Sequence, residues 1–248
     1  MATQNKSSLL VSLFLVTAGI LLFPFLSSCG KGANANSAGL NTQLQILNLS
    51  PDAGPLNLYL NFIKESTATY TYPSNSGYFF LSTLQPPLQL RTTATSPVNV
   101  LTIDSTLKPN AKYTLFITGY KSDKEGSIKN SILSLDTATL PTLGRGKIRF
   151  AHTSPSSPNL DLWANDTRAF SNLPFDSISV YIELPVGNYN FTINAHNIPS
   201  VVQTNIPNVT IQDGWAYTIY TQGIVGRTDS VAFGAAVLSN NLLLKTTQ

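Results

Sequence analysis

The side chains best suited to acid–base or nucleophilic chemistry are few in this chain of 248 residues, which has two histidines and one cysteine. His152 stands two residues before Ser154, so an imidazole base that activates a hydroxyl nucleophile is conceivable there. A catalytic pair of this kind needs a third group that orients the base, and the sequence offers no candidate for it. We therefore expect His152 to hydrogen-bond the backbone of the turn that follows, and we expect no catalytic residues.

The second histidine, His196, lies in the polar stretch Asn194–Asn197, which is typical of a loop, and we expect it to be solvated. No other His, Cys or carboxylate falls at metal-ligand spacing from either histidine. No glycine-rich phosphate loop follows a predicted strand. The sequence therefore predicts neither a metal site nor a cofactor.

The cysteine indicates a different chemistry, which is membrane anchoring. Lys6 is the only charged side chain ahead of an apolar run from Leu9 to Leu26, an arrangement typical of a secretion signal. The run ends in Leu26-Ser27-Ser28-Cys29, which resembles the lipobox of bacterial lipoproteins. In that class the thiol takes a diacylglyceryl group, and the signal is cut before the cysteine.

This resemblance implies a signal peptide over residues 1–28, acylation of Cys29 and a membrane as the partner of the acylated end. Because Gly30 rather than Asp follows the cysteine, it also implies the outer membrane, with periplasmic and surface display both open. The apolar run is close to the minimum length of a spanning helix, so an uncleaved transmembrane anchor is the alternative. Residues 29–43 are small and polar, and we expect a flexible tether there.

Four Asp-Ser or Asp-Thr pairs carry a modification signal. Each is followed by Thr, Ala, Ile or Val, a pattern that resembles the O-glycosylation motif of Bacteroidetes and suggests an origin in that phylum. The same pairs are ordinary turn formers, so both interpretations stay open. The acceptors would be Ser105, Thr137, Ser177 and Ser230.

Composition excludes some partners and permits two cores. Charged residues make up only 11% of the chain, the formal net charge is +3, and the basic residues form no run, so nucleic acid is not an expected partner. Hydrophobic residues make up 42% and aromatic residues 10%, which is ample for two packed domains. With one cysteine, neither domain can contain an internal disulfide.

A duplication organises the chain. The segment SPDAGPLNLYLN at 50–61 returns without a gap as SPSSPNLDLWAN at 154–165, which is 104 residues later. KYTLFITG from Lys112 matches AYTIYTQG from Ala216 at the same offset. Two separate segments at one spacing indicate a repeated domain of about a hundred residues.

The pattern within each copy predicts short strands. Leu56, Leu58 and Leu60 alternate with polar or aromatic residues, and the second copy repeats this alternation, so both segments should be half-buried strands. No helical periodicity of useful length follows the apolar run. We therefore expect an all-β protein with two tandem immunoglobulin-like β-sandwiches, over residues 44–141 and 145–240. In the middle of the copies, the sequence matches 77–81 with 180–184, and, after a small length change, 87–91 with 188–192.

The start of the second copy carries a family resemblance. Phe150-Ala151-His152-Thr153-Ser154-Pro155, followed by Leu160-Asp161-Leu162-Trp163, is similar to the opening motif of the domain-of-unknown-function 4397 family. The first copy has Asn48 where that family has His, and the second has Ser156 where it has Asp. The resemblance covers residue 44 to about residue 240. It implies tandem immunoglobulin-like copies in a secreted or lipid-anchored bacterial protein, and no established activity.

Three functions are compatible with these observations. The first is a non-catalytic structural or interaction module of the cell envelope, with an envelope protein as a further partner. The second is the binding of a glycan or another small ligand, for which residues that differ between the copies are the candidates, such as Arg91, Asp213 and Trp215. The third is a hydrolase, for which the sequence supplies no oriented base.

The lipobox generates a direct prediction. Replacing Cys29 with Ala should prevent both acylation and processing, so that the protein keeps its signal and its apparent mass rises. Mass spectrometry of the N-terminal peptide and membrane partition of both proteins measure this. An unmodified N-terminal peptide in the wild type, with the same mass and partition in the variant, would refute the lipid anchor.

Overall fold

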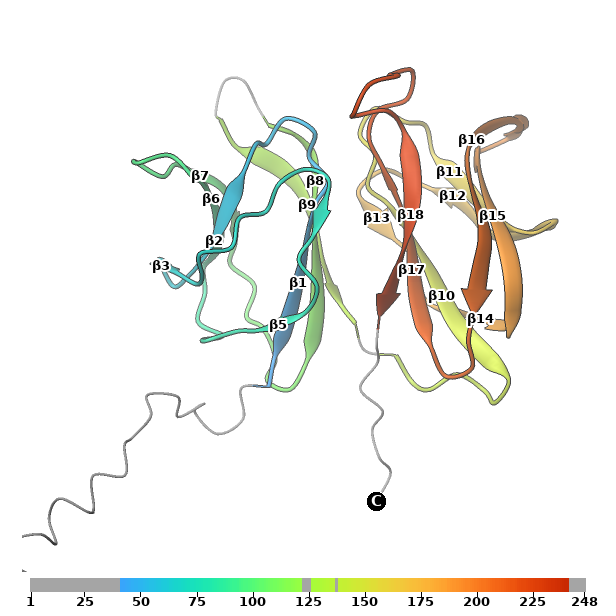
Figure 1. Cartoon of the computed structure of the whole chain (residues 1–248), viewed down its shortest axis with the longest axis horizontal. Coiled ribbons are helices and arrows are strands. Elements are labelled where there is room, and N and C mark those ends of the chain that lie inside the picture. Colours follow the sequence, from blue (N-terminus) through green and yellow to red (C-terminus); the bar gives the residue numbers. More distant parts are fainter. Residues whose placement is uncertain (1–40, 122–125, 137, 241–248) are drawn as a thin grey trace, which may run out of the picture. The chain divides into compact units, whose positions relative to one another are not determined.

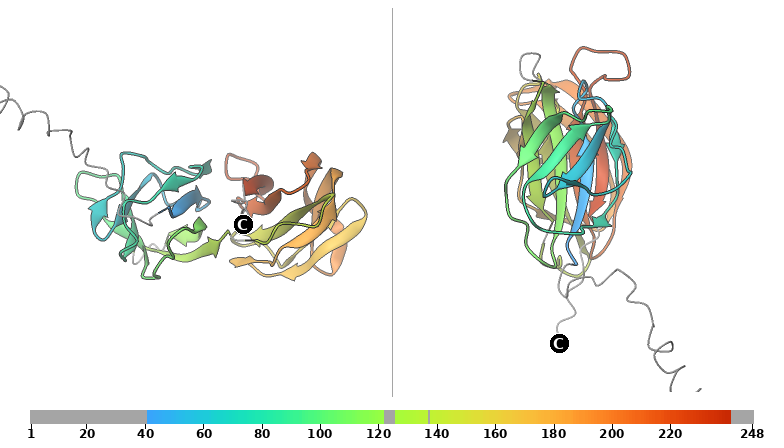
Figure 2. Two further views of the ribbon diagram at one scale, coloured as in Figure 1. Left: turned by 90° about the horizontal axis from the view of Figure 1, so that it is seen from below. Right: turned by 90° about the vertical axis from the view of Figure 1, so that its left-hand side faces the viewer.

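The computed structural model describes residues 41–121, 126–136 and 138–240, and within these ranges the chain consists of strands, turns and loops (Figure 1). Each copy forms its own pair of sheets, so the prediction of two β-sandwiches is confirmed; Figure 2 shows their layers. The described residues belong to one compact unit. Among the described residues no helix is long and apolar enough to cross a membrane. The apolar run, Cys29 and Thr137 lie outside the described residues.

Within the described residues, the first copy forms nine strands in two sheets. One sheet has the order β4-β1-β8-β9, with β5 also paired to β1, and the other has the order β3-β2-β6-β7. The strands are β1 (Gln43–Asn48), β2 (Leu56–Leu60), β3 (Ile63–Lys64), β4 (Ser74–Asn75), β5 (Phe79–Phe80), β6 (Leu88–Thr92), β7 (Asn99–Ile103), β8 (Lys112–Lys121) and β9 (Ile128–Leu135).

The second copy repeats this topology strand for strand. Its sheets have the orders β13-β10-β17-β18, with β14 also on β10, and β12-β11-β15-β16. The strands are β10 (Arg145–His152), β11 (Leu160–Ala164), β12 (Thr167–Leu173), β13 (Ser177–Ile178), β14 (Ile182–Pro185), β15 (Gly187–Ala195), β16 (Ile198–Ile211), β17 (Ala216–Gln222) and β18 (Gly234–Asn240). Adding nine to a strand number of the first copy therefore gives its counterpart.

One pair of neighbouring strands in each copy is parallel. Leu44 of β1 lies beside Tyr113 of β8, and Ile148 of β10 lies beside Tyr217 of β17, which are the same positions 104 residues apart. All other strand pairs are antiparallel. The duplication thus extends to the register of the sheets.

Each sandwich has its own apolar core, built from the inward positions that the alternation predicts. Leu56, Leu58 and Leu60 are at most 2% exposed and pack with the first core. Leu160 and Leu162 occupy the matching places in the second. Strand alternation therefore places the cores correctly.

The structure corrects one part of the alignment between the copies. Leu58 pairs with Leu90, and its counterpart Leu162 pairs with Ile193, so Leu90 corresponds to Ile193. The sequence match of 87–91 with 188–192 is therefore two residues out of register. Because side chains in a strand alternate with a period of two, a two-residue slip keeps inward positions inward and leaves the pattern unchanged. The match of 77–81 with 180–184 is correct, since Phe79 and Ile182 pair with equivalent residues.

Two equivalent glycines lie near the ends of the central strands, Gly119 at an irregularity in the pairing of β8 with β9 and Gly223 directly after β17. Gly119 and Gly223 have φ of 72° and 74°, in the left-handed region that favours glycine. A Cβ atom on Gly223 would lie 2.1 Å from the carbonyl oxygen of Ala232, and one on Gly119 would lie 2.9 Å from Oδ1 of Asn130. Both the conformation and the close approach therefore require glycine at these positions.

Tyr113 and Tyr217 provide a test of the equivalence of the copies. Each is 6% exposed, and each hydroxyl oxygen accepts a hydrogen bond from the backbone N–H five residues earlier, of Lys108 or Gln212. Truncating either tyrosine to Ala should lower the free energy of unfolding by about 3 to 5 kcal/mol. Tyr→Phe variants are the controls, because they lose only the hydroxyl. Denaturant titrations measure this, and a severe loss at one tyrosine with none at the other would contradict the equivalence.

Candidate functional site

Among the described residues, a third buried apolar cluster lies outside the two cores, where the β8 sheet meets the β17 sheet. Leu47, Leu49 and Phe116 of the first copy form an apolar cluster with Ala151 and Leu238 of the second. These residues are at most 5% exposed although they point away from their own cores. Each copy therefore buries one outer sheet face against the other.

The apolar centre of this joint is formed by equivalent positions. The ring centroids of Phe116 and Tyr220, which are 104 residues apart, lie 6.3 Å from each other. Contact between equivalent residues is the signature of a two-fold interface, in which one surface packs against its own copy. The joint is therefore an intramolecular form of a symmetric interface.

A buried ion pair links the copies beside this centre. The Arg149 guanidinium, 3% exposed, donates from Nη2 to Oδ1 of Asp136, whose side chain is 1% exposed. It also donates from Nη1 to Ser134 Oγ at 2.6 Å and from Nε to Thr218 Oγ1 at 2.8 Å. Its carbon Cζ lies 4.7 Å from the ring centroid of Tyr181. The charge of Arg149 is thus paired and hydrogen-bonded in three directions.

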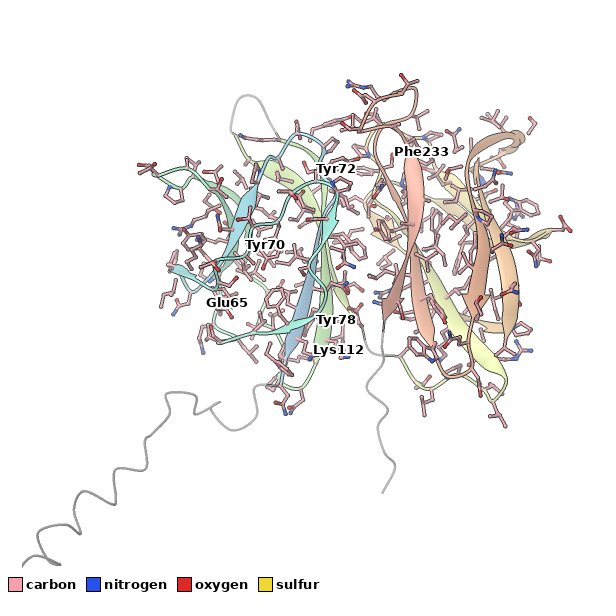
Figure 3. All side chains as sticks on the ribbon, viewed as in Figure 1. Glu65, Tyr70, Tyr72, Tyr78, Lys112 and Phe233 are labelled. Carbon is pink, nitrogen blue, oxygen red and sulfur yellow. The ribbon has the colours of Figure 1, made fainter. Side chains whose placement is uncertain are left out.

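The carboxylate of Asp136 is equally well satisfied. Its Oδ2 accepts from the Tyr78 hydroxyl at 2.8 Å and from Thr114 Oγ1 at 2.5 Å. Asn240 of the second copy donates from Nδ2 to the Tyr78 oxygen at 3.0 Å, which adds a second link across the joint. Burial, followed by the negative charge of Asp136, raises the pKa of Tyr78, so this hydroxyl keeps its proton and remains a donor. Figure 3 labels Tyr78 together with Lys112. The Lys112 ammonium lies 4.9 Å from the centroid of the Tyr78 ring.

No sequence pattern predicted this network, although the repeat offset contains its signal. Thr114 and Thr218 are equivalent, and their partners Asp136 and Asn240 are also 104 residues apart. The position of Arg149 is occupied by Gln45 in the first copy. The two copies therefore differ in charge at the positions that face each other.

A third polar link joins the copies at the other end of β8. The carboxylate of Asp176, in the second copy, accepts from Thr118 Oγ1 at 2.6 Å and from Asn130 Nδ2 at 3.1 Å. Both donors belong to the first copy. The joint is therefore fixed near both ends of β8 and at its centre.

Next to the ion pair, the surface is hollowed into a groove of about 400 Å³. Lys147 lies on its wall and donates from Nζ to the carbonyl oxygen and the hydroxyl of Thr139, each at 2.7 Å. Burial raises the pKa of Tyr181, also on the wall, to about 12. Both cations that line the groove, Lys147 and Arg149, are thus already engaged by protein groups.

His152 bonds the turn that follows it, as predicted. The imidazole is 0% exposed, and its Nε2 lies 3.0 Å from the Pro158 carbonyl oxygen and 3.2 Å from Ser157 Oγ. Nδ1 lies 3.3 Å from the hydroxyl of Thr221. Ser154 does not pair with His152, because its hydroxyl donates to the Gly223 carbonyl at 2.6 Å.

His196 was expected to be solvated, but it is half-buried and contacts a carboxylate. Its Nδ1 lies 2.8 Å from Oδ1 of Asp161, and its side chain is 22% exposed. Burial alone would raise the pKa of Asp161, but the Asn172 N–H, His196 and Arg168 outweigh it and lower this pKa. The sequence could not show this pair, because β15 brings the two residues together across 35 positions. Among the described residues, no three His, Cys, Asp or Glu side chains gather as metal ligands would.

The predicted modification sites fall into different environments. Ser105 and Ser230 are exposed, whereas Ser177 is half-buried in β13 beside the joint. Cys29 and Thr137 lie outside the described residues, and glycosylation stays a prediction at all four acceptors.

The residues that differ between the copies are dispersed. The guanidinium of Arg91 lies 4.4 Å from the ring centroid of Tyr59, Asp213 accepts a hydrogen bond from the Gly144 N–H, and Trp215 stacks on Tyr217. They do not form one site.

The burial of His152 generates a pH prediction. Burial lowers its pKa from 6.5 to about 4, so the unfolded chain takes up a proton that the native chain does not. The free energy of unfolding should therefore fall by up to about 3 kcal/mol as the pH decreases from 6.5 to 4. His152→Asn, which introduces the residue of the first copy, should remove this share of the slope. Equal slopes for the two proteins in urea titrations would contradict the assignment.

The comparisons with known proteins agree with this architecture. A family model described as a domain of unknown function (DUF4397) matches residues 42–161 and again residues 146–243. No curated protein matches the chain. Since the two matches together cover most of the chain, the protein belongs to the DUF4397 family and carries its domain in two tandem copies.

Proposed function

We propose that this protein is a non-catalytic module of the cell envelope, anchored in the outer membrane by acylated Cys29, in which the paired copies act as one rigid interaction or spacer unit. The observation that carries this proposal is the buried joint. An ion pair, two further polar links and an apolar centre fix one copy on the other. A rigid pair keeps a binding surface at a constant orientation to its anchor, which a flexible string of domains does not.

The energetics of the joint favour one fixed arrangement. Each ion of a buried pair costs several kcal/mol to desolvate, and only well-placed partners compensate for this. Arg149 and Asp136 find their partners in one relative placement of the copies, because Ser134, Thr114 and Tyr78 complete the shell around them. Sliding one copy on the other would leave both charges buried and unpaired.

The environments of the histidines support a non-catalytic role. A general base must reach the proton that it removes, and His152 has no exposed surface. The His196–Asp161 pair is partly exposed, but Asp161 also holds the backbone N–H of Asn172 and lies 3.6 Å from Arg168. The Asp161 carboxylate on β11 thus contacts two residues of β12 and stabilises the pairing of these strands.

Glycan binding is the alternative that a specific observation favours. Both copies carry an aromatic residue on an outward sheet face with an arginine guanidinium over its ring, namely Tyr59 with Arg91 and Trp163 with Arg168. Half-buried rings next to guanidinium groups are suited to sugars, which stack on aromatic faces and accept hydrogen bonds. A glycan array with the chain from residue 40 onward, compared with its Tyr59→Ala and Trp163→Ala variants, tests this. Binding that both variants lose would favour the alternative.

Rigidity is tested by the distance between spin labels on the two copies. The chain from residue 40 onward contains no cysteine, so Thr102→Cys on β7 and Ser200→Cys on β16 provide two exposed labelling sites. We expect a single narrow distance distribution. A broad distribution in the otherwise unchanged chain would refute the rigid unit.

Asp136→Asn then tests the cause of the rigidity. It leaves Arg149 buried without its counter-ion, which should lower the free energy of unfolding by about 3 to 5 kcal/mol and broaden the distribution. Asp104→Asn is the matched control, because it removes an exposed carboxylate. Equal effects of the two substitutions would contradict the role of the ion pair.

A further inference from the structure

The strand register places the ends of several strands at one end of each copy. Gln43, at the start of β1, pairs with Lys112 at the start of β8, whose neighbour Tyr113 pairs with Leu135 at the end of β9. In the second copy Ala216, at the start of β17, pairs with both Lys147 and Asn240. The chain thus enters the first copy at the same end from which it continues into the second.

The joint aligns these ends of the two copies. Asn240 donates to Tyr78, and Tyr78 precedes Phe79, which pairs with Leu44 near the start of β1. Hence the tether that precedes β1 and the β10 end of the second copy belong to the same end of the unit, which we call the entry end.

The entry end carries a group of exposed apolar side chains on connected turns. Leu143 is 89% exposed, Val186 47% and Trp215 39%, and we call these three residues the apolar tip. The Val186 N–H donates to the Gly144 carbonyl at 3.0 Å, and Gly214 N–H donates to Arg145 at 3.0 Å. The three turns are therefore bonded to one another, which places the residues of the tip on adjoining turns.

The chain outside the described residues restricts what can cover this tip. Thirteen residues, Gly30 to Thr42, separate Cys29 from β1. Fully extended they would span at most about 45 Å, so the lipid anchor holds the entry end near the bilayer. A tethered surface meets its target at high effective concentration, and even a small apolar area then binds. Tryptophan is also the residue that prefers the boundary between lipid and water.

We propose that the apolar tip docks on the lipid bilayer in which Cys29 is anchored, and so orients the paired sandwiches on the membrane. This inference rests on the proposed lipid anchor. Leu143 and Val186 enter the headgroup region, and Trp215, held by its stacking on Tyr217, lies at its edge. The opposite end of β8 and β17 then faces away from the membrane.

The single cysteine allows a test that does not depend on acylation in the cell. The chain from Cys29 onward is coupled through its thiol to maleimide-bearing lipid in vesicles of phosphatidylethanolamine and phosphatidylglycerol with brominated acyl chains. Trp163→Phe leaves Trp215 as the only indole, and Trp215→Phe leaves Trp163, which lies on β11 away from the tip. We expect coupling to quench most of the Trp215 emission and to shift it to the blue, with Trp163 unchanged.

Leu143→Ser should abolish the quenching of Trp215. Ile63→Ser is the matched control, because Ile63 is 71% exposed on β3 and outside the tip, and it should leave the quenching intact. Unquenched Trp215, equal quenching of both tryptophans, or equal effects of the two serine variants would overturn the docking. If a tryptophan variant fails to fold, vesicle-dependent protection of the Leu143 amide from hydrogen exchange in the coupled wild type decides the same question. Since coupling replaces acylation, failure here leaves the Cys29→Ala result, and with it the anchor, unaffected.

Discussion

The buried ion pair between Arg149 and Asp136 is the interaction on which the arrangement of the two copies depends. A buried pair is weak evidence for stability, because desolvation of both ions offsets much of their attraction. Its effect is on the specificity of the placement of the two copies. The free-energy cost of leaving one buried charge without its partner is far larger than the net stability gained by forming the pair. Arg149 and Asp136 each have three polar partners, and this supports the proposal that the copies adopt one placement.

Divergence between the copies made this pairing directional. Two identical faces would place identical residues opposite each other. Phe116 and Tyr220 still approach this arrangement, because they are equivalent aromatic residues in contact. Around this centre the copies differ in charge, with Gln45 and Asp136 in the first and Arg149 and Asn240 in the second. A first copy therefore complements a second copy better than it complements another first copy. Such complementarity disfavours association between like copies of different chains.

The residues that most resemble a catalytic set hold the fold together. His152 and its counterpart Asn48 both bond the turn after the first strand of their copy, Asn48 through the carbonyl oxygen of Gly54. Asn48 also donates to the carbonyl oxygen of Tyr70, which lies beyond β3. A side chain that satisfies buried carbonyls removes the cost of leaving them unpaired. Asp161 does the same for the N–H of Asn172. Recurrence of the role in both copies, with different residue types, indicates a structural requirement of the turn.

The sequence by itself determined the all-β class, the duplication and the inward residues of each core, because strand alternation and a constant offset are local patterns. It also located the turn that holds His152, since a proline and small polar residues mark it. It misaligned 87–91 with 188–192, because a two-residue slip preserves alternation. Only the tertiary structure decided that Thr114, Phe116 and Thr118, on the outer face of β8, are fully buried against the second copy. The ion pair, the Asp161–His196 contact and the grouping of Leu143 with Trp215 likewise depend on which strands become neighbours. That choice is made by the packing of whole sheets, which no local pattern encodes.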